Sequence, residues 1–339
     1  MRVLLDTHML GRNDTGNERY WKNLTEYIKQ VGKKIKTVKY DLLPRNGLFR
    51  LALGLTTAAK TGRADIIHVQ NFAPLIKTVP LVTTVHDLCS KTHTSLFGWK
   101  TRIAFQFFFK RTLNLSDAII CVSKETKHQL LKFYKISPKK VFVVYEAADE
   151  CFYFIKDKDR IKRSLLQKFN IKDKYFLVVG AIESRKLPYE IINSFNRIQD
   201  KIPGVKLIFA GPNKLGIKST LNIKILGYVT DEELNLLYNG SKALIYLSLC
   251  EGFGLPIVEA MATKTPVVCS NLSVLREITG NQTIFINNGQ ELSGIMELLI
   301  KNDSLGKKYG DLGYKRSNYF SWGKNVQETL KIYKKLCNE

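Results

Sequence analysis

Two glutamates, Glu251 and Glu259, flank a short segment that contains two glycines. Gly252 and Gly254 lack a Cβ atom, so the backbone there can come close to a ligand. Pro256 suits the first turn of a helix, and the free amides before it would form an anion site suited to phosphate. A carboxylate is repelled by phosphate, but it can accept hydrogen bonds from sugar hydroxyls. Two such acceptors around a diphosphate indicate a nucleotide-sugar, with ribose on one side and hexose on the other.

A more ordinary interpretation is also open, because glycine loops before helices are common in α/β proteins. In that interpretation Glu251 is a solvated loop residue and Glu259 interacts with the helix dipole. The segment lies between two apolar runs of strand length, residues 243–247 and 266–269. The stretch 243–270 therefore predicts a buried strand, a glycine loop, a short helix and a second buried strand. Spacing alone does not separate the two interpretations.

The literal sequence is more specific than its spacing. Residues 251–262, followed by 265–268 and by Ser270-Asn, closely resemble the signature of the retaining nucleotide-sugar glycosyltransferases of family four, whose motif is two glutamates separated by seven residues. The resemblance implies that the first glutamate and the amides after it hold the donor hexose, while the second glutamate binds the nucleotide ribose. The donor-binding roles carry over onto Glu251, Gly252, Phe253, Gly254, Leu255 and Glu259.

A cationic loop follows the apolar run 175–180. It contains Arg185, which can grip phosphate oxygens in a bidentate fork, and Lys186, which adds a point charge. The family has a similar Gly…Glu-x-Arg-Lys segment, and the resemblance implies that these cations bind the donor diphosphate. Leu187 stands where the family usually has asparagine, so the finer geometry of the loop is left open.

Three further positions of the second half are compared with the family. Gly211 and Tyr228 lie at strand ends where the family contacts the nucleotide base, largely through the backbone. These contacts do not reveal which base is bound. Leu247 replaces a proline that is common in the family, and we expect a local change without loss of activity.

His86 and Asp87 come directly after the apolar run 81–85, at the carboxyl end of a predicted strand. In open α/β sheets, ligands lie outside these ends. A lone histidine there is commonly a hydrogen-bonded structural residue. The family has a His-Asp pair at this point, and the resemblance implies that His86 reaches the donor sugar and that Asp87 lies at the acceptor cleft.

Two other positions of the first half are expected near the acceptor. The loop 11–17 leads into a helix predicted from about Glu18 to Val31, and Gly16-Asn-Glu-Arg-Tyr20 resembles the family's Gly-x-x-Arg-Tyr. A surface turn remains an alternative for Gly16. Ser123 is a predicted helix N-cap, and the resemblance places it near the acceptor cleft.

Short apolar runs alternate with helical patterns along the chain, which is typical of α/β proteins with parallel sheets. The 339 residues are enough for two domains. We predict an N-terminal acceptor-binding domain over 1–155 and a C-terminal donor-binding domain over 170–318, with a charged, breaker-like boundary within 150–174. The resemblance implies the GT-B fold, in which two doubly wound Rossmann-like domains face each other across a cleft. It also implies that a final helix within 321–339 crosses back to the N-terminal domain.

The predicted strands cover residues 2–6, 35–40, 65–69, 81–85, 118–122 and 141–144 in the first half, and 175–180, 206–210, 223–227, 243–247, 266–269 and 283–286 in the second. No apolar stretch is long enough to span a membrane, and the N-terminus reads as a strand instead of a signal peptide. We therefore expect a cytoplasmic protein that is peripheral to the membrane if it associates with one.

The formal net charge of +23 is unusual for a protein of this size. An anionic membrane surface, a genome-wide composition bias and nucleic acid are three possible explanations. The lysines are scattered singly and in pairs, without a long run, and nucleic acid ranks last. Residues 99–113 mix four phenylalanines with four basic residues, which fits a helix at a membrane interface; a core helix with one charged face is the alternative.

The reaction implied by the resemblance is transfer of a hexose from a nucleoside diphosphate to an acceptor hydroxyl, with the anomeric configuration retained. Arg185, Lys186 and the amides after Glu251 would stabilise the departing diphosphate without a metal or other cofactor. The Glu-x-Arg-Lys form is similar to bacterial O-antigen mannosyltransferases, which suggests GDP-mannose as donor and a glycan or lipid-linked oligosaccharide as acceptor. Another GT-B enzyme, an epimerase or a phosphorylase, and a basic nucleic-acid-binding protein are the alternatives.

Overall fold

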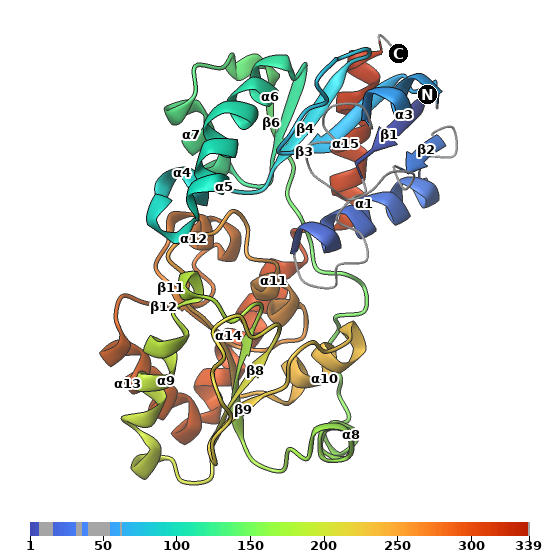
Figure 1. The fold of residues 1–339 in the computed structure, drawn as a ribbon. Helices are drawn as coiled ribbons and strands as arrows, with labels where there is room; N and C mark the ends of the chain where they lie inside the picture. Colours follow the sequence, from blue (N-terminus) through green and yellow to red (C-terminus); the bar gives the residue numbers. More distant parts are fainter. Residues whose placement is uncertain (7–15, 32–35, 40–54, 62, 338–339) are drawn as a thin grey trace. The chain divides into compact units, whose positions relative to one another are not determined.

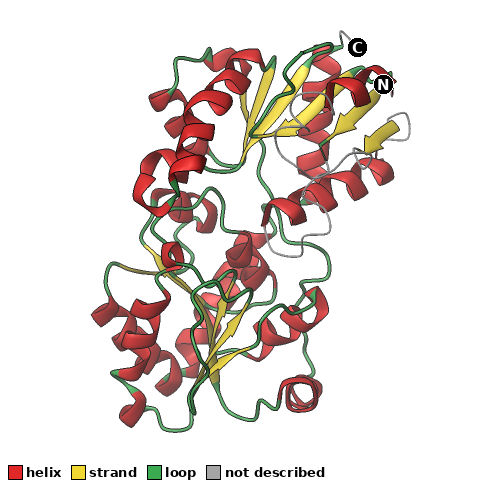
Figure 2. Cartoon of the chain, in the orientation of Figure 1, coloured by secondary structure: helices red, strands yellow, loops and turns green. Residues whose placement is uncertain are grey.

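The computed structural model describes residues 1–6, 16–31, 36–39, 55–61 and 63–337. Most of the predicted loop 11–17, up to residue 15, lies outside the described residues. The chain divides into two compact units, here called unit 1 (Met1–Glu146 with Ser321–Glu339) and unit 2 (Ala147–Phe320). Each unit is an α/β structure with helices on both faces of a parallel sheet (Figures 1 and 2). The predicted fold class of two Rossmann-like halves is confirmed.

Unit 1 contains a six-stranded sheet with the order β2-β1-β3-β4-β5-β6, and every neighbouring pair is parallel. Its strands are β1 (Arg2–Leu5), β2 (Lys36–Lys39), β3 (Ile66–Gln70), β4 (Leu81–Val85), β5 (Ala118–Cys121) and β6 (Val141–Val143). Every residue of β3, β4 and β5 is buried. A parallel sheet that is covered on both faces needs such continuous apolar strands, which is why the sequence made them visible.

Unit 2 contains a second six-stranded parallel sheet with the order β12-β11-β10-β7-β8-β9. Its strands are β7 (Tyr175–Val179), β8 (Lys206–Ala210), β9 (Ile223–Ile225), β10 (Ala243–Tyr246), β11 (Val267–Ser270) and β12 (Ile284–Ile286). The central neighbours β7 and β10 are buried along their whole length. All the strands predicted for the two halves are present, and their ends lie within two residues of the predicted ones.

The helices of unit 1 are α1 (Gly16–Val31), α3 (Leu55–Thr61), α4 (Cys89–Thr92), α5 (Trp99–Ala104), α6 (Lys110–Leu115), α7 (Lys124–Phe133) and α15 (Trp322–Leu336). The helices of unit 2 are α8 (Lys158–Phe169), α9 (Pro188–Asn196), α10 (Asp231–Gly240), α11 (Leu255–Ala262), α12 (Ser273–Thr279), α13 (Gly289–Lys301) and α14 (Asp303–Ser317). None of these helices is both long and apolar enough to cross a bilayer.

The C-terminal helix α15 belongs to unit 1 and packs against α1, as predicted for the last helix. A buried hydrogen-bonded line fixes it to the sheet. The Tyr333 hydroxyl lies 2.5 Å from Nδ1 of His68, and Nε2 of His68 lies 2.7 Å from Oγ1 of Thr84. The same Thr84 oxygen lies 3.1 Å from the hydroxyl of Tyr20 on α1. Residues 265 positions apart in the sequence are therefore joined inside one core.

The chain passes from unit 1 to unit 2 between Glu146 and Ala147, earlier than the boundary segment 150–174 placed from the sequence. The reason is that residues 152–155 are bound to α10. The backbone amide of Ile155 donates to Oδ1 of Asn239 at 2.7 Å, and the Phe152 ring packs edge-on against Tyr238. The charged stretch after it is not a breaker, since Asp157 caps α8 by accepting from the Arg160 amide at 2.8 Å.

Candidate functional site

The strand order of unit 2 reverses between β7 and β10, because β8 follows β7 on one side while β10 lies on the other. In doubly wound sheets, ligands bind at such a switch point, outside the carboxyl ends of the strands. The loop after β7 carries Arg185 and Lys186 in a short 3₁₀ turn. Glu251 follows β10 on the neighbouring loop. The topology of the sheet thus brings the predicted cations and the first predicted glutamate to one place.

Glu251 joins both cations through a single oxygen atom. Nζ of Lys186 lies 2.6 Å from Oε1 of Glu251, and Nη1 of Arg185 lies 3.0 Å from the same oxygen. Nη1 of Arg185 also donates to the backbone carbonyl of Cys250 at 2.8 Å. A backbone hydrogen bond of 3.0 Å from the Leu249 amide to the Arg185 carbonyl ties the two loops together. The cations are held in a fixed arrangement before any ligand arrives.

The electrostatics of this cluster follow from its burial, since the Glu251 and Lys186 side chains are only 9% and 12% exposed. Burial alone would raise the pKa of Glu251, but Lys186 and Arg185 outweigh it and hold that pKa at about 2. Burial lowers the pKa of Lys186, while the carboxylate of Glu251 opposes that shift. Glu251 is therefore a permanent anion whose main partners are the two cations.

Tyr246, at the end of β10, is a member of this cluster that sequence reasoning missed. Nζ of Lys186 donates to the Tyr246 hydroxyl at 2.6 Å and also lies 4.0 Å from the centre of its ring. Burial and the neighbouring Glu251 raise the pKa of Tyr246 well above its usual value, so the phenol stays neutral. Tyr246 is the one polar side chain in the apolar run 243–247, and that signal could have identified it.

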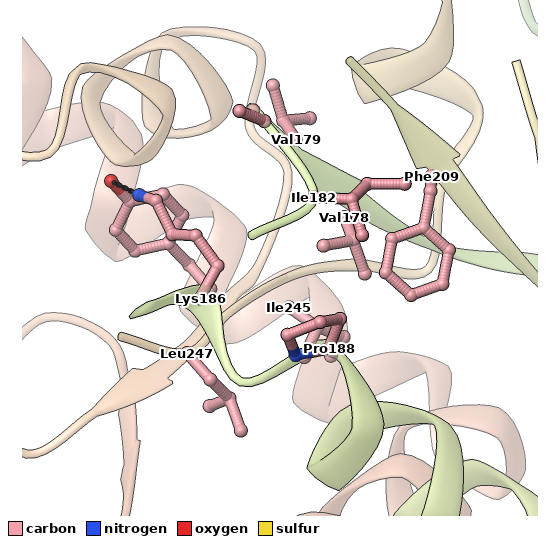
Figure 3. Close-up of a pocket in the computed structure, with 11 residues that line it drawn as sticks. Val178, Val179, Ile182, Lys186, Pro188, Phe209, Ile245 and Leu247 are labelled. Carbon is pink, nitrogen blue, oxygen red and sulfur yellow. Dashed lines mark hydrogen bonds between the residues drawn. The ribbon is translucent and has the colours of Figure 1, made fainter. Parts of the chain in front are cut away.

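A small apolar pocket lies behind the cationic loop, and Lys186 is at its edge, with its hydrogen bond drawn as a dashed line (Figure 3). Val178, Ile182 and Phe209 line it from the β7 and β8 side, and Ile245 and Leu247 line it from the β10 side. Apolar walls of this kind reduce hydration of the ammonium group, which strengthens its interaction with an anion. Leu247, which stands in place of the family's proline, is buried as part of this wall.

The glycine segment has the backbone conformation that its sequence indicated. Gly254 has φ +96° and precedes α11, and a Cβ atom there would come within 3.2 Å of Leu275. Phe253 is buried edge-on against Phe320, while Gly252 and Leu255 are also buried. The amides before α11 are therefore held by packing on both sides of the loop.

Glu259 is less accessible than we expected for a carboxylate that accepts hydrogen bonds from sugar hydroxyls. It is fully buried, and Oε2 accepts a hydrogen bond of 2.9 Å from the Tyr238 hydroxyl. Its predicted contact with the nucleotide ribose stays a prediction, and that contact would have to share the carboxylate with Tyr238.

Three glycines end the neighbouring strands β7, β8 and β9 with positive φ angles: Gly180 (+111°), Gly211 (+144°) and Gly227 (+71°). The Gly211 amide donates to the Gly227 carbonyl at 2.7 Å. A Cβ atom on Gly211 would come to 2.1 Å from the Gly180 carbonyl oxygen, so no other residue fits there. Tyr228, which follows, is 59% exposed. The predicted contacts of Gly211 and Tyr228 with the nucleotide base stay predictions.

Leu187 adopts the left-handed conformation, with φ +50° and ψ +45°. Asparagine tolerates this region better than leucine does, which accounts physically for the asparagine of the resembling sequences. The leucine side chain instead packs against the core of unit 2. Leu187 therefore ends the turn in a left-handed conformation and adds its side chain to the edge of the core.

In unit 1, His86 follows β4 and is 8% exposed. Nδ1 of His86 lies 3.0 Å from Oε1 of the buried Glu146, and the Tyr20 ring stands edge-on at 4.9 Å. Because the carboxylate accepts, Nδ1 carries the proton. Nε2 is buried and makes no hydrogen bond within the described part of the chain. His86 thus has one nitrogen that Glu146 holds and one buried nitrogen without a hydrogen-bond partner among the described residues.

The other predicted residues of unit 1 have local structural roles. The Asp87 carboxylate accepts from the Cys89 amide at 2.8 Å, and Ser123 caps α7 by accepting from the Thr126 amide at 3.0 Å. Gly16 is exposed at the start of α1. The predicted N-cap at Ser123 is present, whereas the predicted proximity of these three residues to an acceptor stays untested.

Two family models match successive parts of the chain. The model described as "Glycosyltransferase Family 4" matches residues 8–150, and the model described as "Glycosyl transferases group 1" matches residues 159–316. Together they account for most of both units. The chain belongs to the family-four glycosyltransferases.

Two curated relatives match this glycosyltransferase over about three quarters of their own length. The O-antigen chain mannosyltransferase RfbU of Salmonella typhimurium is 27% identical over 286 residues, which cover 79% of this chain and 76% of the relative. The O-antigen chain mannosyltransferase B of Escherichia coli is 27% identical over 296 residues, which cover 80% and 74%.

Solved structures agree on the fold of the glycosyltransferase. WaaG, a glycosyltransferase involved in lipopolysaccharide biosynthesis, has a TM-score of 0.76 at 12% identity, with 98% of this chain and 99% of that chain covered. Anabaena Alr3699/HepE, solved with UDP-glucose, has a TM-score of 0.72 at 17% identity, with 100% and 99% covered. These likenesses establish the GT-B fold.

Among the predicted site residues of the glycosyltransferase, the structure brings Arg185, Lys186 and Glu251 into direct contact. Within the described ranges, no group of three or more His, Cys, Asp and Glu residues could hold a metal ion. Arg185 and Lys186 each place a positive charge in this part of the site.

Proposed function

We propose that this glycosyltransferase moves mannose from GDP-mannose to a hydroxyl of a growing surface polysaccharide, with retention of the anomeric configuration and without a metal ion. The relatives named O-antigen chain mannosyltransferases support the choice of sugar and of acceptor class. A neighbour of known structure was solved with UDP-glucose, which supports a nucleotide-sugar as the donor class. The lipid-linked form of the glycan is the acceptor that we propose.

The single observation that carries this proposal is the cluster of Arg185, Lys186 and Glu251 at the switch point of unit 2. The chemical requirement of the reaction is to stabilise negative charge on the departing diphosphate. Preorganised positive groups in a poorly hydrated site do this best, because they need no reorganisation when the charge develops. Arg185 and Lys186 are groups of this kind. In the proposed reaction they stabilise the negative charge that a divalent metal ion stabilises in other enzymes.

The state of Glu251 supports a mechanism in which it is not the nucleophile. Its carboxylate is a fixed anion with a pKa of about 2, and one oxygen serves both Lys186 and Arg185. Such an oxygen is a poor attacking group. In the proposed step, the bond from the anomeric carbon to the phosphate oxygen breaks, and the acceptor oxygen bonds to that carbon from the same face. The acceptor's proton passes to the departing phosphate oxygen.

His86 is proposed to contact the donor sugar through Nε2. Its Nδ1 is held by Glu146, and Nε2 has no hydrogen-bond partner among the described residues. A buried polar atom without a partner is costly unless a ligand or water completes it. A sugar hydroxyl would satisfy that nitrogen.

The proposal is tested by incubating the full chain with GDP-mannose and a lipid-linked acceptor, and by reading the new linkage with nuclear magnetic resonance. We expect an α-linked product from the α-configured donor, and turnover that survives EDTA. A β-linked product would contradict retention, and loss of turnover that magnesium restores would contradict metal independence. Epimerisation or phosphorolysis without an acceptor would assign the chain to another class of GT-B enzyme.

A further inference from the structure

Five charged side chains of unit 2 form one row in which positive and negative charges alternate. Glu251 joins Lys186 to Arg185 through a single oxygen. On the other side of the same guanidinium, Oε1 of Glu183 accepts from Nη2 at 2.9 Å and from Nε at 3.2 Å. Oε2 of Glu183 lies 3.3 Å from Nζ of Lys214, in the loop after β8. We call these five residues, from Lys186 to Lys214, the charge row.

All three nitrogens of the Arg185 guanidinium donate to atoms of the protein itself. Nη1 donates to Oε1 of Glu251 and to the Cys250 carbonyl, while Nε and Nη2 share Oε1 of Glu183. An arginine that grips a phosphate in a bidentate fork uses two neighbouring N–H groups at once. A contact between Arg185 and a diphosphate therefore requires one of the present acceptors to leave.

Glu183 is the acceptor that can leave most easily. Its side chain is 27% exposed, whereas the Glu251 side chain is 9% exposed and its oxygen is also held by Lys186. The Glu183 carboxylate has a second cation within reach, because Lys214 contacts its other oxygen. Lys214 is 50% exposed, so a carboxylate that turns towards it stays in contact with water. The displaced charge is thus never left buried without a partner.

The backbone holds Lys214 beside Glu183 without help from their side chains. The Lys214 amide donates to the Ile182 carbonyl at 3.1 Å, and the Ile182 amide donates to the Pro212 carbonyl at 2.8 Å. These bonds already join the loops after β7 and β8. The Glu183 carboxylate is not needed for that purpose, so its place between two cations calls for another explanation.

We propose that Glu183 is a positioning residue of the donor site. Before the donor binds, Glu183 holds Arg185 as an internal counter-ion; the donor diphosphate then replaces it on Arg185, and its carboxylate turns fully onto Lys214. The inference rests on the proposed function, because it needs a diphosphate at Arg185. The returning carboxylate competes with the nucleoside diphosphate product and so helps to release it. Glu251 keeps its place throughout, since Lys186 shares its oxygen.

A purely structural role of Glu183 predicts the opposite effect on binding. If the carboxylate only orients Arg185, its loss weakens the binding of a diphosphate. If the carboxylate competes for Arg185, its loss strengthens binding, because the apparent affinity of a ligand is reduced when only a fraction of the protein is in the competent arrangement. The direction of the change separates the two roles.

Isothermal titration with GDP and with UDP, in the absence of acceptor, measures this direction. Glu183→Gln keeps the shape of the side chain and removes its charge, and we expect it to bind the diphosphates about fivefold more tightly than the wild type. In the transfer assay the same variant should be inhibited more strongly by the nucleoside diphosphate product.

Glu297→Gln is the matched control for Glu183→Gln. Glu297 also lies between two lysines, at 3.3 Å from Lys201 and 2.6 Å from Lys301, and its side chain is 22% exposed. Lys201 precedes β8, so this pair lies at the amino ends of the strands, whereas the charge row lies at their carboxyl ends. Glu297→Gln should therefore bind GDP and UDP as the wild type does.

Lys214→Gln tests where the displaced carboxylate goes. We expect it to weaken diphosphate binding about threefold, because Glu183 then has no second cation to move to. In a double-mutant cycle this loss should disappear in the Glu183→Gln background, whereas a lysine that contacts the diphosphate directly would cause the loss in both backgrounds. Lys218→Gln, at an exposed lysine of the same loop, is the control for the change in net charge.

Each outcome of these titrations decides a specific point, provided that circular dichroism and the urea midpoint show a folded variant. Weaker or unchanged diphosphate binding by Glu183→Gln would overturn the proposal. Equal losses from Lys214→Gln in both backgrounds would overturn the movement of Glu183 onto Lys214. A wild type that binds neither GDP nor UDP would overturn the proposed function as well. Tighter binding by Glu183→Gln in a protein that transfers no mannose would count against the proposed reaction alone.

Discussion

The ammonium group of Lys186 lies 2.6 Å from a carboxylate oxygen of Glu251, and the two residues belong to loops that leave the neighbouring strands β7 and β10. The pair spans the switch point of the unit 2 sheet. It therefore does two things at once: it joins the two loops of the site, and it sets the position of a cation that can later face a diphosphate.

Removing Glu251 should destabilise unit 2 strongly. Glu251→Ala leaves Lys186 buried without its carboxylate, a change that costs about 3 kcal/mol or more in buried pairs. Urea unfolding of the wild type and the variant measures this loss in the free energy of unfolding. Glu183→Ala is the matched control, because Glu183 pairs with the same Arg185 but is 27% exposed, and a pair so exposed contributes about 1 kcal/mol or less. Equal losses for the two variants would contradict the assigned role of burial.

Tyr246→Phe should reduce transfer more than it reduces stability. The variant keeps the ring beside Lys186 but removes the hydroxyl that accepts from Nζ at 2.6 Å. A hydrogen bond to a charged group contributes about 1.5–3 kcal/mol, so we expect kcat to fall roughly tenfold or more as Lys186 loses its orientation. Tyr189→Phe, on an exposed tyrosine of α9, should leave the rate unchanged. An unchanged kcat in Tyr246→Phe would show that the Tyr246 hydroxyl has no role in the transfer reaction.

Gly211→Ala should be among the most damaging single substitutions in unit 2. The new methyl group would lie 2.1 Å from the Gly180 carbonyl oxygen, so one of the two strand ends must move. Gly216→Ala is the control, since Gly216 also has a positive φ but has open space around it. Strain alone costs about 1 kcal/mol there, and the clash should add several kcal/mol in Gly211→Ala. Thermal unfolding of the two variants tests this, and similar stabilities would contradict it.

The stability of unit 1 should depend on His68 in mildly acidic solution. Burial lowers the pKa of this imidazole from 6.5 to about 3 in the folded chain. Between these two pH values the unfolded chain binds a proton that the folded chain excludes, so stability falls as the pH falls. The loss reaches about 2.7 kcal/mol two pH units below the unfolded pKa. Urea unfolding at pH 7 and pH 4.5 should show a shallower dependence in His68→Gln than in His128→Gln, whose residue is exposed. An equal dependence in both would contradict the prediction.

The strands and the cationic site were predictable because their causes are local in sequence. A strand that is buried on both faces must be a short apolar run, as Tyr175–Val179 is. Ligands of an α/β sheet lie at strand ends, so the loops with Arg185 and Glu251 could be placed without coordinates. The π-helical turn at Phe105–Phe109 and the exposed side of its helix could not, since one added residue per turn changes which phenylalanine faces inward.

Contacts between distant parts of the chain also could not be predicted from the sequence. Tyr333 contacts His68 from 265 positions away, and neither residue belongs to a motif. The complete burial of Glu259 depends on Tyr238, which comes from another helix. The helix α8 was missed for a different reason, because its many charged residues suggested a linker. In the structure Ile161 and Leu165 are buried on one face of α8, which is therefore an amphipathic helix.

The measurement that tests the central claim most directly compares the binding of nucleoside diphosphates and monophosphates by isothermal titration. If Lys186 and Arg185 hold the diphosphate, the wild type should bind GDP or UDP at least tenfold more tightly than the matching monophosphate. That preference should largely disappear in Lys186→Gln and persist in Lys218→Gln, whose lysine is exposed elsewhere in unit 2. A Lys186→Gln protein that keeps the full preference for the diphosphate would contradict the account.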